Sequence, residues 1–151
     1  MTLALPDHGV KTKHGPEGSL VFDPLRGRWV TLTPEEWVRQ HFINHLVQDL
    51  GYPAGLIGVE WSLELNGLAK RADIVVFSTD GRPLALVECK APSVRIGQRT
   101  FEQAARYNRV LRVRHLMVTN GIQHFACLVD HHTGAVDFLP RLPLHAHLTV
   151  A

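Results

Sequence analysis

Apolar residues along positions 33–50 recur at the spacing of an amphipathic helix. They lie three or four positions apart, which places them on one face of a helix. Thr33 supplies an N-cap, Pro34 suits the first turn, and Glu36 completes a capping box. Gly51 then ends the helix. We therefore predict a helix from Pro34 to about Leu50, with the apolar stripe Val38, Phe42, Ile43, Leu46, Val47 and Leu50.

Three charged residues interrupt this apolar stripe. Glu35 and Arg39 fall inside it, and Glu36 lies at its edge. A charge on a buried helix face costs free energy unless it is paired. These three side chains therefore need partners or a chemical role.

The rest of the chain shows apolar runs typical of strands and one further helical stretch. Two short apolar pieces before the first helix, around Val21–Phe22 and Trp29–Leu32, predict a small hairpin. A second helix is expected over about Gln98–Leu111. The predicted strands are Ile57–Leu65, Lys70–Phe77, Leu84–Lys90, His115–Thr119 and Phe125–Val129, with a weak strand near Val136–Leu139. The order helix, three strands, helix, two strands predicts an α/β fold with a mixed sheet.

Length and composition fit one globular domain. Residues 1–18 show little apolar pattern and predict a loosely ordered N-terminal arm, so the domain is expected over residues 19–151. No apolar stretch approaches the roughly 18 residues that span a bilayer, and the first residues lack the features of a signal peptide. Cys89 and Cys127 lie far apart in apolar runs and are expected to be buried thiols. We therefore predict a cytoplasmic protein without membrane association.

The turn between two predicted strands indicates which residues face each other. A two-residue loop at Asp80–Gly81 would pair Thr79 with Arg82 and, counting back along both strands, Asp73 with Glu88. Directly opposed side chains have Cβ atoms about 4.5–5.5 Å apart, and two opposed carboxylates repel each other. A divalent cation between them removes this repulsion, and Mg²⁺ commonly takes one or two carboxylates as ligands.

This arrangement favours metal-dependent hydrolysis of phosphodiesters. A metal ion lowers the pKa of a bound water and neutralises charge that develops on the phosphate. Asp73 and Glu88 are candidate metal ligands, with the backbone carbonyl of Cys89 completing the set. Lys90 lies two positions after Glu88, on the same strand face, and would orient the water and stabilise the phosphate. The alternative is a simple ion pair between Lys90 and either carboxylate.

Positive charge concentrates after the last of these residues. Six arginines and one acid, Glu102, occur from Ala91 to Arg114, whereas the whole chain has a net charge of +2. A local excess of this kind is suited to phosphate binding, although a solvated helix face gives the same pattern. The candidate DNA-binding arginines are Arg95, Arg99 and Arg106.

These residues resemble a known family of nucleases. Asp73, followed after a hairpin by Glu88-Cys89-Lys90, resembles the D…ExK signature of the PD-(D/E)XK superfamily. Gln103 and Tyr107 are similar to the QxxxY motif of its RecB-like branch. With Trp29, LTPEEWVRQHF, GYP, VECKAP and Thr119-Asn120-Gly121, they look like the N-terminal nuclease-like domain of type I restriction enzyme R subunits, over roughly Ser19 to Val129.

The resemblance implies a three-layer α/β/α restriction-endonuclease-like fold around a mixed central sheet. It implies Asp73, Glu88 and Lys90 as the catalytic core, with Mg²⁺ or Mn²⁺ as cofactor. Gln103 would stabilise the site, and Tyr107 would contact the DNA backbone. The acid of the first helix would be a further catalytic group; we assign it to Glu36, with Glu35 as the alternative. Ala72 stands where the superfamily signature has proline.

The leading hypothesis is therefore a metal-dependent DNA endonuclease. The sequence has no GxxxxGK[ST] phosphate loop, so no motor of its own is expected. The alternative is a non-catalytic nucleic-acid-binding or interaction module of the same fold. Either protein would act with DNA and with an unlinked motor or specificity subunit, and a homodimer would supply two sites for double-strand cuts.

Two other chemistries find less support in the sequence. His41 and His45 lie one helical turn apart without a third ligand nearby, whereas zinc needs three or four converging ligands. The pair His131-His132 lies in a predicted turn. Neither Ser78 nor Ser93 has the surroundings of a nucleophilic serine.

Overall fold

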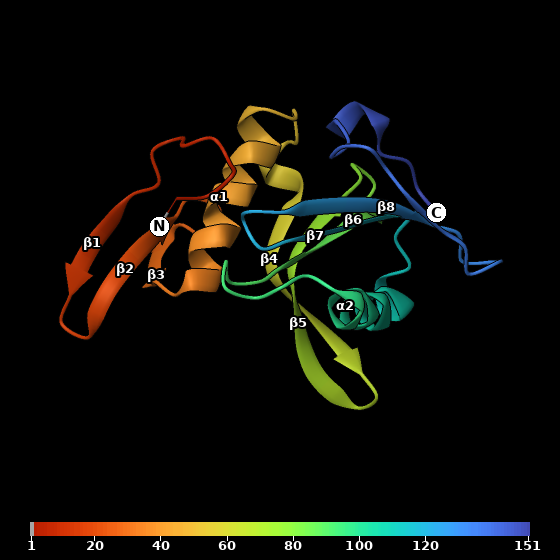
Figure 1. Ribbon diagram of the computed structural model, residues 1–151, viewed down its shortest axis with the longest axis horizontal. Coiled ribbons are helices and arrows are strands. Elements are labelled where there is room, and N and C mark those ends of the chain that lie inside the picture. The colour runs from red at the N-terminus through yellow and green to blue at the C-terminus, as the bar shows by residue number, and fades with distance from the viewer. Residues whose placement is uncertain (1) are drawn as a thin grey trace.

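A six-stranded mixed sheet forms the centre of the molecule in the computed structural model, which describes residues 2–151 (Figure 1). Its strands lie in chain order: β4 (Ile57–Leu65), β5 (Leu68–Phe77), β6 (Pro83–Cys89), β7 (His115–Thr119), β8 (His124–Val129) and β9 (Val136–Phe138). β6 and β7 run parallel, joined through a helix, and the other neighbours are antiparallel. The predicted mixed α/β fold is confirmed.

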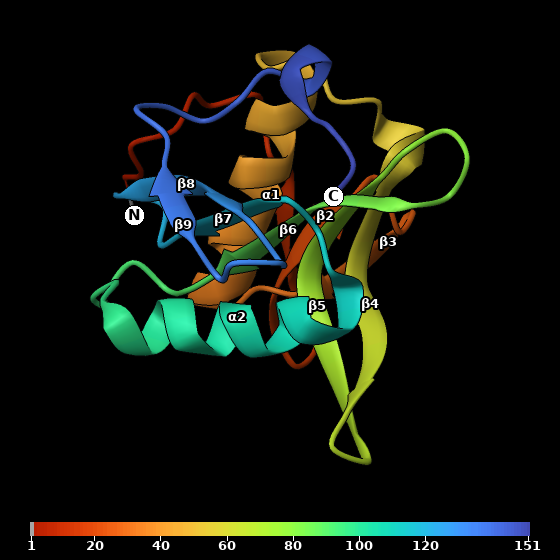
Figure 2. The same ribbon diagram turned by 90° about the vertical axis from the view of Figure 1, so that its right-hand side faces the viewer.

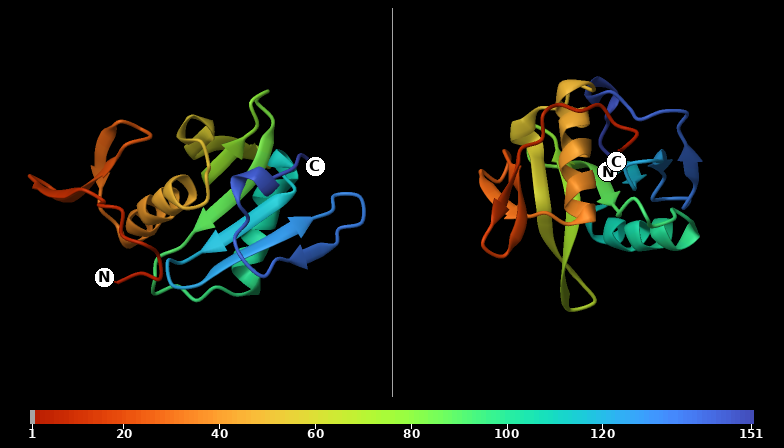
Figure 3. Two further views of the ribbon diagram at one scale, coloured as in Figure 1. Left: turned by 90° about the horizontal axis from the view of Figure 1, so that it is seen from above. Right: turned by 60° about the vertical axis from the view of Figure 1, so that its left-hand side comes forward.

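Two helices cover opposite faces of this sheet. α1 (Pro34–Gln48) packs Phe42 and Leu46 against Val87 of β6, whereas α2 (Gln98–Leu111) packs Ala104 against Leu86. Successive residues of a strand point to opposite faces, so adjacent residues of β6 serve two separate cores. Figures 2 and 3 show the helices on the two sides of the sheet. Neither helix of the described residues is long and apolar enough to cross a membrane.

A second sheet of three antiparallel strands stands beside α1 (Figure 3). It consists of β1 (Thr12–Gly15), β2 (Gly18–Asp23) and β3 (Arg28–Thr31). The predicted hairpin is β2 and β3, but β1 lies inside the arm that was expected to be loosely ordered over residues 1–18. β1 is short, and its first three residues are exposed, so it lacks the apolar alternation of a recognisable strand. Met1 lies outside the described residues.

The N-terminal segment before β1 is also attached to the domain. Leu3 and Leu5 pack against the core beneath α1, and the Ala4 amide donates to the carbonyl of Gly121 at 2.8 Å. Two short 3-10 helices, η1 (Ala54–Leu56) and η2 (His145–His147), lie in connecting segments.

The turn between β5 and β6 differs from the predicted two-residue loop. The amide of Ser78 donates to the carbonyl of Arg82 at 2.7 Å, so the loop is longer than Asp80–Gly81. A register shift between Val76 and Phe77 compensates for this difference. The ladder therefore pairs Ile74 with Val87, and one step further along both strands brings Asp73 to the level of Glu88, as predicted.

A sharp bend in β4 and β5 lies beside Asp73. Glu60 has a φ of 49°, in the left-handed region that non-glycine residues rarely occupy. Before the bend, Val59 packs with the core under α1; after it, Leu63 packs with the core under α2. Beyond the bend the two strands project from the sheet as a hairpin (Figure 1). Strained backbone of this kind is common at functional sites.

Substitution of one buried and one exposed leucine tests which residues form the core. Leu46 is 0% exposed beneath α1, whereas Leu68, near the tip of the projecting hairpin, is 61% exposed. We expect Leu46→Ala to lower the free energy of unfolding by about 2–5 kcal/mol, because it leaves a cavity. Leu68→Ala should change it by no more than about 0.5 kcal/mol. Urea unfolding followed by circular dichroism measures both, and equal effects would contradict this core.

Candidate functional site

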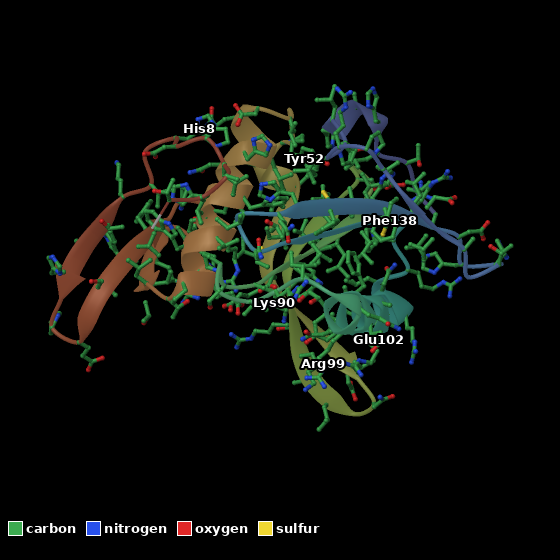
Figure 4. All side chains as sticks on the ribbon, viewed as in Figure 1. His8, Tyr52, Lys90, Arg99, Glu102 and Phe138 are labelled. Atoms are coloured by element: carbon green, nitrogen blue, oxygen red, sulfur yellow. The ribbon has the colours of Figure 1, made fainter. Side chains whose placement is uncertain are left out.

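The predicted site residues converge where β5 and β6 pass the first turn of α1 and the side of α2. Asp73 comes from β5, Glu88 from the end of β6, and Lys90 from the residue that follows Cys89. In Figure 4, Lys90 lies near the middle of the molecule, between the lower end of α1 and α2. Sheet and helices therefore bring together residues from distant parts of the chain.

Asp73 and Glu88 form a buried pair of carboxyl groups with unequal surroundings. Asp73 accepts hydrogen bonds from the Cys89 amide, at 2.8 Å to Oδ2, and from Arg39 Nη2, at 2.8 Å to Oδ1. Glu88 is 3% exposed, and its Oε1 has no hydrogen-bond partner. Burial, reinforced by the neighbouring Asp73 carboxylate, raises the pKa of Glu88 to about 9. In the absence of a cation, Glu88 therefore holds a proton at neutral pH.

Lys90 is held by α2 and not by the carboxylates. Its Nζ donates to Oε1 of Gln103 at 2.7 Å. Among the described residues, no ion pair joins Lys90 to Asp73 or Glu88, so the simple ion pair considered as an alternative does not form. Lys90 still influences both neighbouring acids, because its charge opposes the rise in the pKa of Glu88 and of Glu35.

The two acids of α1 occupy different environments. Glu36 is buried, and its Oε1 accepts from Arg26 Nη2 and Arg39 Nη1, each at 2.7 Å. Its Oε2 accepts from Gln40 Nε2 at 3.2 Å. Glu35 is half-exposed and accepts from Arg39 Nη2 at 3.2 Å. Burial and the Asp73 carboxylate raise the pKa of Glu35, so this acid shares the electrostatic field of the carboxyl pair.

Two arginines, the buried Arg39 and the partly buried Arg26, join these groups and were not predicted as site residues. Arg39 is 4% exposed and bridges Asp73, Glu35 and Glu36. Arg26 donates to Asp23 and Glu36 and, at 3.0 Å, to Oε2 of Glu60. Arg39 had a signal, since it interrupts an apolar stripe. Arg26 lies in an ordinary turn of the sequence, where nothing distinguishes it from a solvated residue.

The remaining predicted residues lie on α2, except Arg95, which lies in the loop before this helix. Arg95, Arg99 and Arg106 are exposed, and no ion pair involves them in the described part of the chain. Arg99 and Arg106 flank Gln103 at helical spacing, so the three side chains lie on one face of α2. Tyr107 is 9% exposed and belongs to the core under α2.

The histidines form no metal centre. His41 is buried against Trp37, and His45 lies 2.7 Å from Asp49. Within residues 2–151, no three side chains of the types His, Cys, Asp and Glu are grouped so as to hold an ion. The Cys89 thiol is fully buried in the core beneath α1, and burial raises its pKa well above the usual range.

The carboxyl pair nevertheless fits a hard divalent cation. Glu88 presents a buried oxygen without a partner, and Asp73 lies beside it. Mg²⁺ binds oxygen, needs as few as one or two protein carboxylates, and keeps several of its waters. A backbone carbonyl such as that of Cys89 is a ligand of the same type. The donor set therefore suits Mg²⁺ or Mn²⁺ better than zinc.

The raised pKa of Glu88 predicts a pH-dependent stability. Without a cation, the native state keeps a proton that the unfolded chain loses, so unfolding becomes easier as the pH rises from about 4.5 towards about 9. Glu88→Gln removes this dependence. At pH 8 in EDTA, we expect the variant to be more stable than the wild type by on the order of 2 kcal/mol, with no difference at pH 4. Denaturant unfolding at both pH values measures this, and parallel pH profiles would contradict it.

Comparison with known proteins places the fold and the family. No curated protein is detectably similar to this chain. A solved fragment, described as the HsdR subunit of a type I restriction enzyme from Vibrio vulnificus, has a similar fold, with a TM-score of 0.57 and 24% sequence identity. The match covers 78% of this chain and 24% of that chain, so the present protein corresponds to about a quarter of it. The family model described as type I restriction enzyme R protein N terminus (HSDR_N) matches residues 34–143, most of the chain, and the protein belongs to this family.

Proposed function

We propose that this protein is a Mg²⁺-dependent nuclease that hydrolyses phosphodiester bonds of DNA, on a restriction-endonuclease-like α/β/α fold. The observation that carries the proposal is the buried Oε1 of Glu88, which has no partner and lies beside Asp73. A buried carboxyl pair without a ligand costs stability, and such groups are retained where they have a chemical role. Membership of the family supports a restriction-enzyme context.

Asp73 and Glu88 would hold the ion, together with the backbone carbonyl of Cys89. When bound there, Mg²⁺ would lower the pKa of a coordinated water and neutralise charge on the phosphate. Glu88 must lose its proton to become a ligand. The pH at which this occurs depends on the concentration of Mg²⁺, because cation binding and protonation compete for the same oxygens.

Lys90 and Gln103 would act on the phosphate as a unit. The amide of Gln103 fixes the ammonium group of Lys90 by a hydrogen bond of 2.7 Å. This contact keeps Lys90 from collapsing onto the carboxyl pair and leaves its remaining N–H groups for a phosphate oxygen or the attacking water. A preorganised positive charge lowers the barrier because no reorganisation is needed during the reaction.

Glu35 is the better candidate for the acid contributed by the first helix. Both oxygens of Glu36 are occupied by Arg26, Arg39 and Gln40. Glu35 is accessible and interacts with Asp73 and Lys90. We therefore assign Glu35 to positioning water at the site and Glu36 to holding the arginines.

DNA would lie across α2, where Arg99 and Arg106 flank Gln103. Arg95 and the hydroxyl of Tyr107 are further candidate contacts. The solved relative is about four times as long as the part it shares with this chain. We propose that an unlinked motor or specificity subunit cooperates with this cytoplasmic domain, and that a homodimer supplies two sites for cuts in both strands.

A non-catalytic nucleic-acid-binding module is the second candidate. The observation that favours it is the ion pair between Arg39 and Asp73, with Nη2 2.8 Å from Oδ1. A guanidinium group in this position already neutralises one of the two carboxylates. Such a domain would bind DNA through α2 without cleaving it.

Cleavage of supercoiled plasmid with Mg²⁺, Mn²⁺ or EDTA distinguishes the two candidates. We expect metal-dependent nicking by the wild type, and a loss of at least about 100-fold in Glu88→Gln and Lys90→Ala, because each removes a group that stabilises the transition state. Glu64→Gln, at an exposed carboxylate of β4, is the matched control and should retain full activity. DNA binding without nicking under all conditions would favour the non-catalytic module.

The adjacent acids of α1 allow a second, paired experiment. Glu35→Gln should raise the Mg²⁺ concentration needed for half-maximal cleavage by about 10-fold, with little change in stability. Glu36→Gln should lower the free energy of unfolding by about 3 kcal/mol, because it weakens a buried ion-pair network. Metal titration and urea unfolding of both variants measure these effects. The reverse pattern would restore Glu36 as the catalytic acid.

A further inference from the structure

The three-stranded sheet is a part of this protein that the family match does not include. The match begins at residue 34, whereas β1, β2 and β3 end at Thr31. The sheet stands to one side of α1 and is not hydrogen-bonded to the central sheet (Figure 3). The matched region therefore does not extend to this sheet, although Trp29 is among the residues on which the family resemblance rests.

One face of this sheet carries aromatic and basic side chains together. Strand pairing places Phe22 opposite Trp29, and Lys13 opposite Leu20, which is two residues from Phe22. Residues two apart on a strand share a face, so Lys13, Phe22 and Trp29 lie on the same side. Val21 and Asp23 point to the other side and are fully buried. The aromatic and basic face is therefore the one turned away from the core.

Trp29 and its neighbours form an ordered group on this outer face. The ammonium of Lys13 lies 4.3 Å from the centroid of the Trp29 ring, and the Phe22 ring contacts Trp29 edge-on, with centroids 5.3 Å apart. Lys13 is exposed on this face. Arg28, which lies opposite Asp23 on the edge strand β3, points to the other face but is exposed as well, and no ion pair involves either residue within the described residues. The acid of these strands, Asp23, is buried and paired with Arg26.

A groove connects Trp29 with the candidate active site. A cavity of about 670 Å³ is lined by Arg28 and Trp29 of β3 and also by Glu35, Arg39 and Ala91. Ala91 directly follows Lys90, and Glu35 interacts with Asp73. Trp29 and residues next to the candidate site therefore border the same cavity.

We propose that this face of the three-stranded sheet binds an unpaired segment of the DNA strand whose phosphate enters the site. A base stacks on Trp29, and the flanking phosphates contact Lys13 on this face and Arg28 at the edge of the sheet. Single-stranded nucleic acids are bound by this combination of a basic groove and aromatic platforms, without reading of sequence. Bases inside a duplex are already stacked on each other, so the surface selects unpaired DNA. The inference deepens the proposed function and rests on it in one respect: that the bound DNA strand continues into the candidate nuclease site.

Binding of a labelled twelve-nucleotide oligothymidylate in EDTA tests the proposal without cleavage. Fluorescence anisotropy should show about a 10-fold loss of affinity in Trp29→Ala, and recovery of most of the loss in Trp29→Phe. Lys13→Ala should reduce the slope of log affinity against log salt concentration by about 1, since one phosphate contact is lost. Trp61→Ala is the matched control, because Trp61 is 44% exposed on β4, and it should bind like the wild type.

Two further measurements, duplex binding and plasmid nicking, distinguish unpaired from paired DNA and this inference from the proposed nuclease activity. A blunt duplex of the same length should bind Trp29→Ala and wild type equally; an equal loss on both DNAs would overturn selection of unpaired bases. Wild-type affinity in Trp29→Ala and Lys13→Ala together would overturn the sheet as a DNA surface. Lys13 is exposed, so its variant stays informative if Trp29→Ala unfolds. If the wild type nicks plasmid but the Trp29→Ala and Lys13→Ala variants bind the oligonucleotide as the wild type does, this inference alone is rejected. If these variants lose oligonucleotide binding but the wild type does not nick plasmid, the proposed nuclease activity alone is rejected.

Discussion

The close approach of the buried Asp73 and Glu88 carboxyl groups on neighbouring strands is the constraint around which the rest of the site is arranged. Two carboxyl groups at one level of adjacent strands cannot both ionise cheaply in a buried environment. Asp73 accepts hydrogen bonds from the Cys89 amide and from Arg39. Glu88 receives no such support at Oε1, and its raised pKa is the consequence. The asymmetry leaves one oxygen of the pair available to a cation.

The same constraint explains why distant parts of the chain meet at this point. Six carboxyl groups gather around the site and its support: Asp23, Glu35, Glu36, Glu60, Asp73 and Glu88. Four cations lie beside them: Arg26, Arg39, Arg71 and Lys90. Arg26, after β2, links the three-stranded sheet to α1 and to the bend of β4. The excess of carboxyl groups over cations favours either a retained proton or a bound divalent cation. Cation binding of this kind is what the proposed function requires.

Much of this site follows from local patterns in the sequence, and the rest depends on contacts between distant residues. The N-cap of Thr33, whose hydroxyl accepts from the Glu36 amide, acts within α1, and the spacing of Gln103 and Tyr107 acts within α2, so both helices were predictable. The level of Asp73 and Glu88 was predicted correctly from a turn that is not formed, because the register shift near Phe77 offsets the longer loop. Arg26 and Arg39 join strands and helices far apart in sequence, and no local pattern encodes such pairs.

The surroundings of Arg39 decide whether a metal ion can take its place as the partner of Asp73. Arg39 holds Asp73, but its guanidinium also bonds Glu36 at 2.7 Å and Glu35 at 3.2 Å, and lies 3.6 Å from Glu60. If Asp73 were its only acidic partner, Arg39 would be left unpaired when a metal ion bound Asp73, and an unpaired buried charge costs free energy. Arg39 keeps at least two partners after that loss. Release of Asp73 to a cation therefore leaves no buried charge uncompensated, and the ion pair is compatible with catalysis.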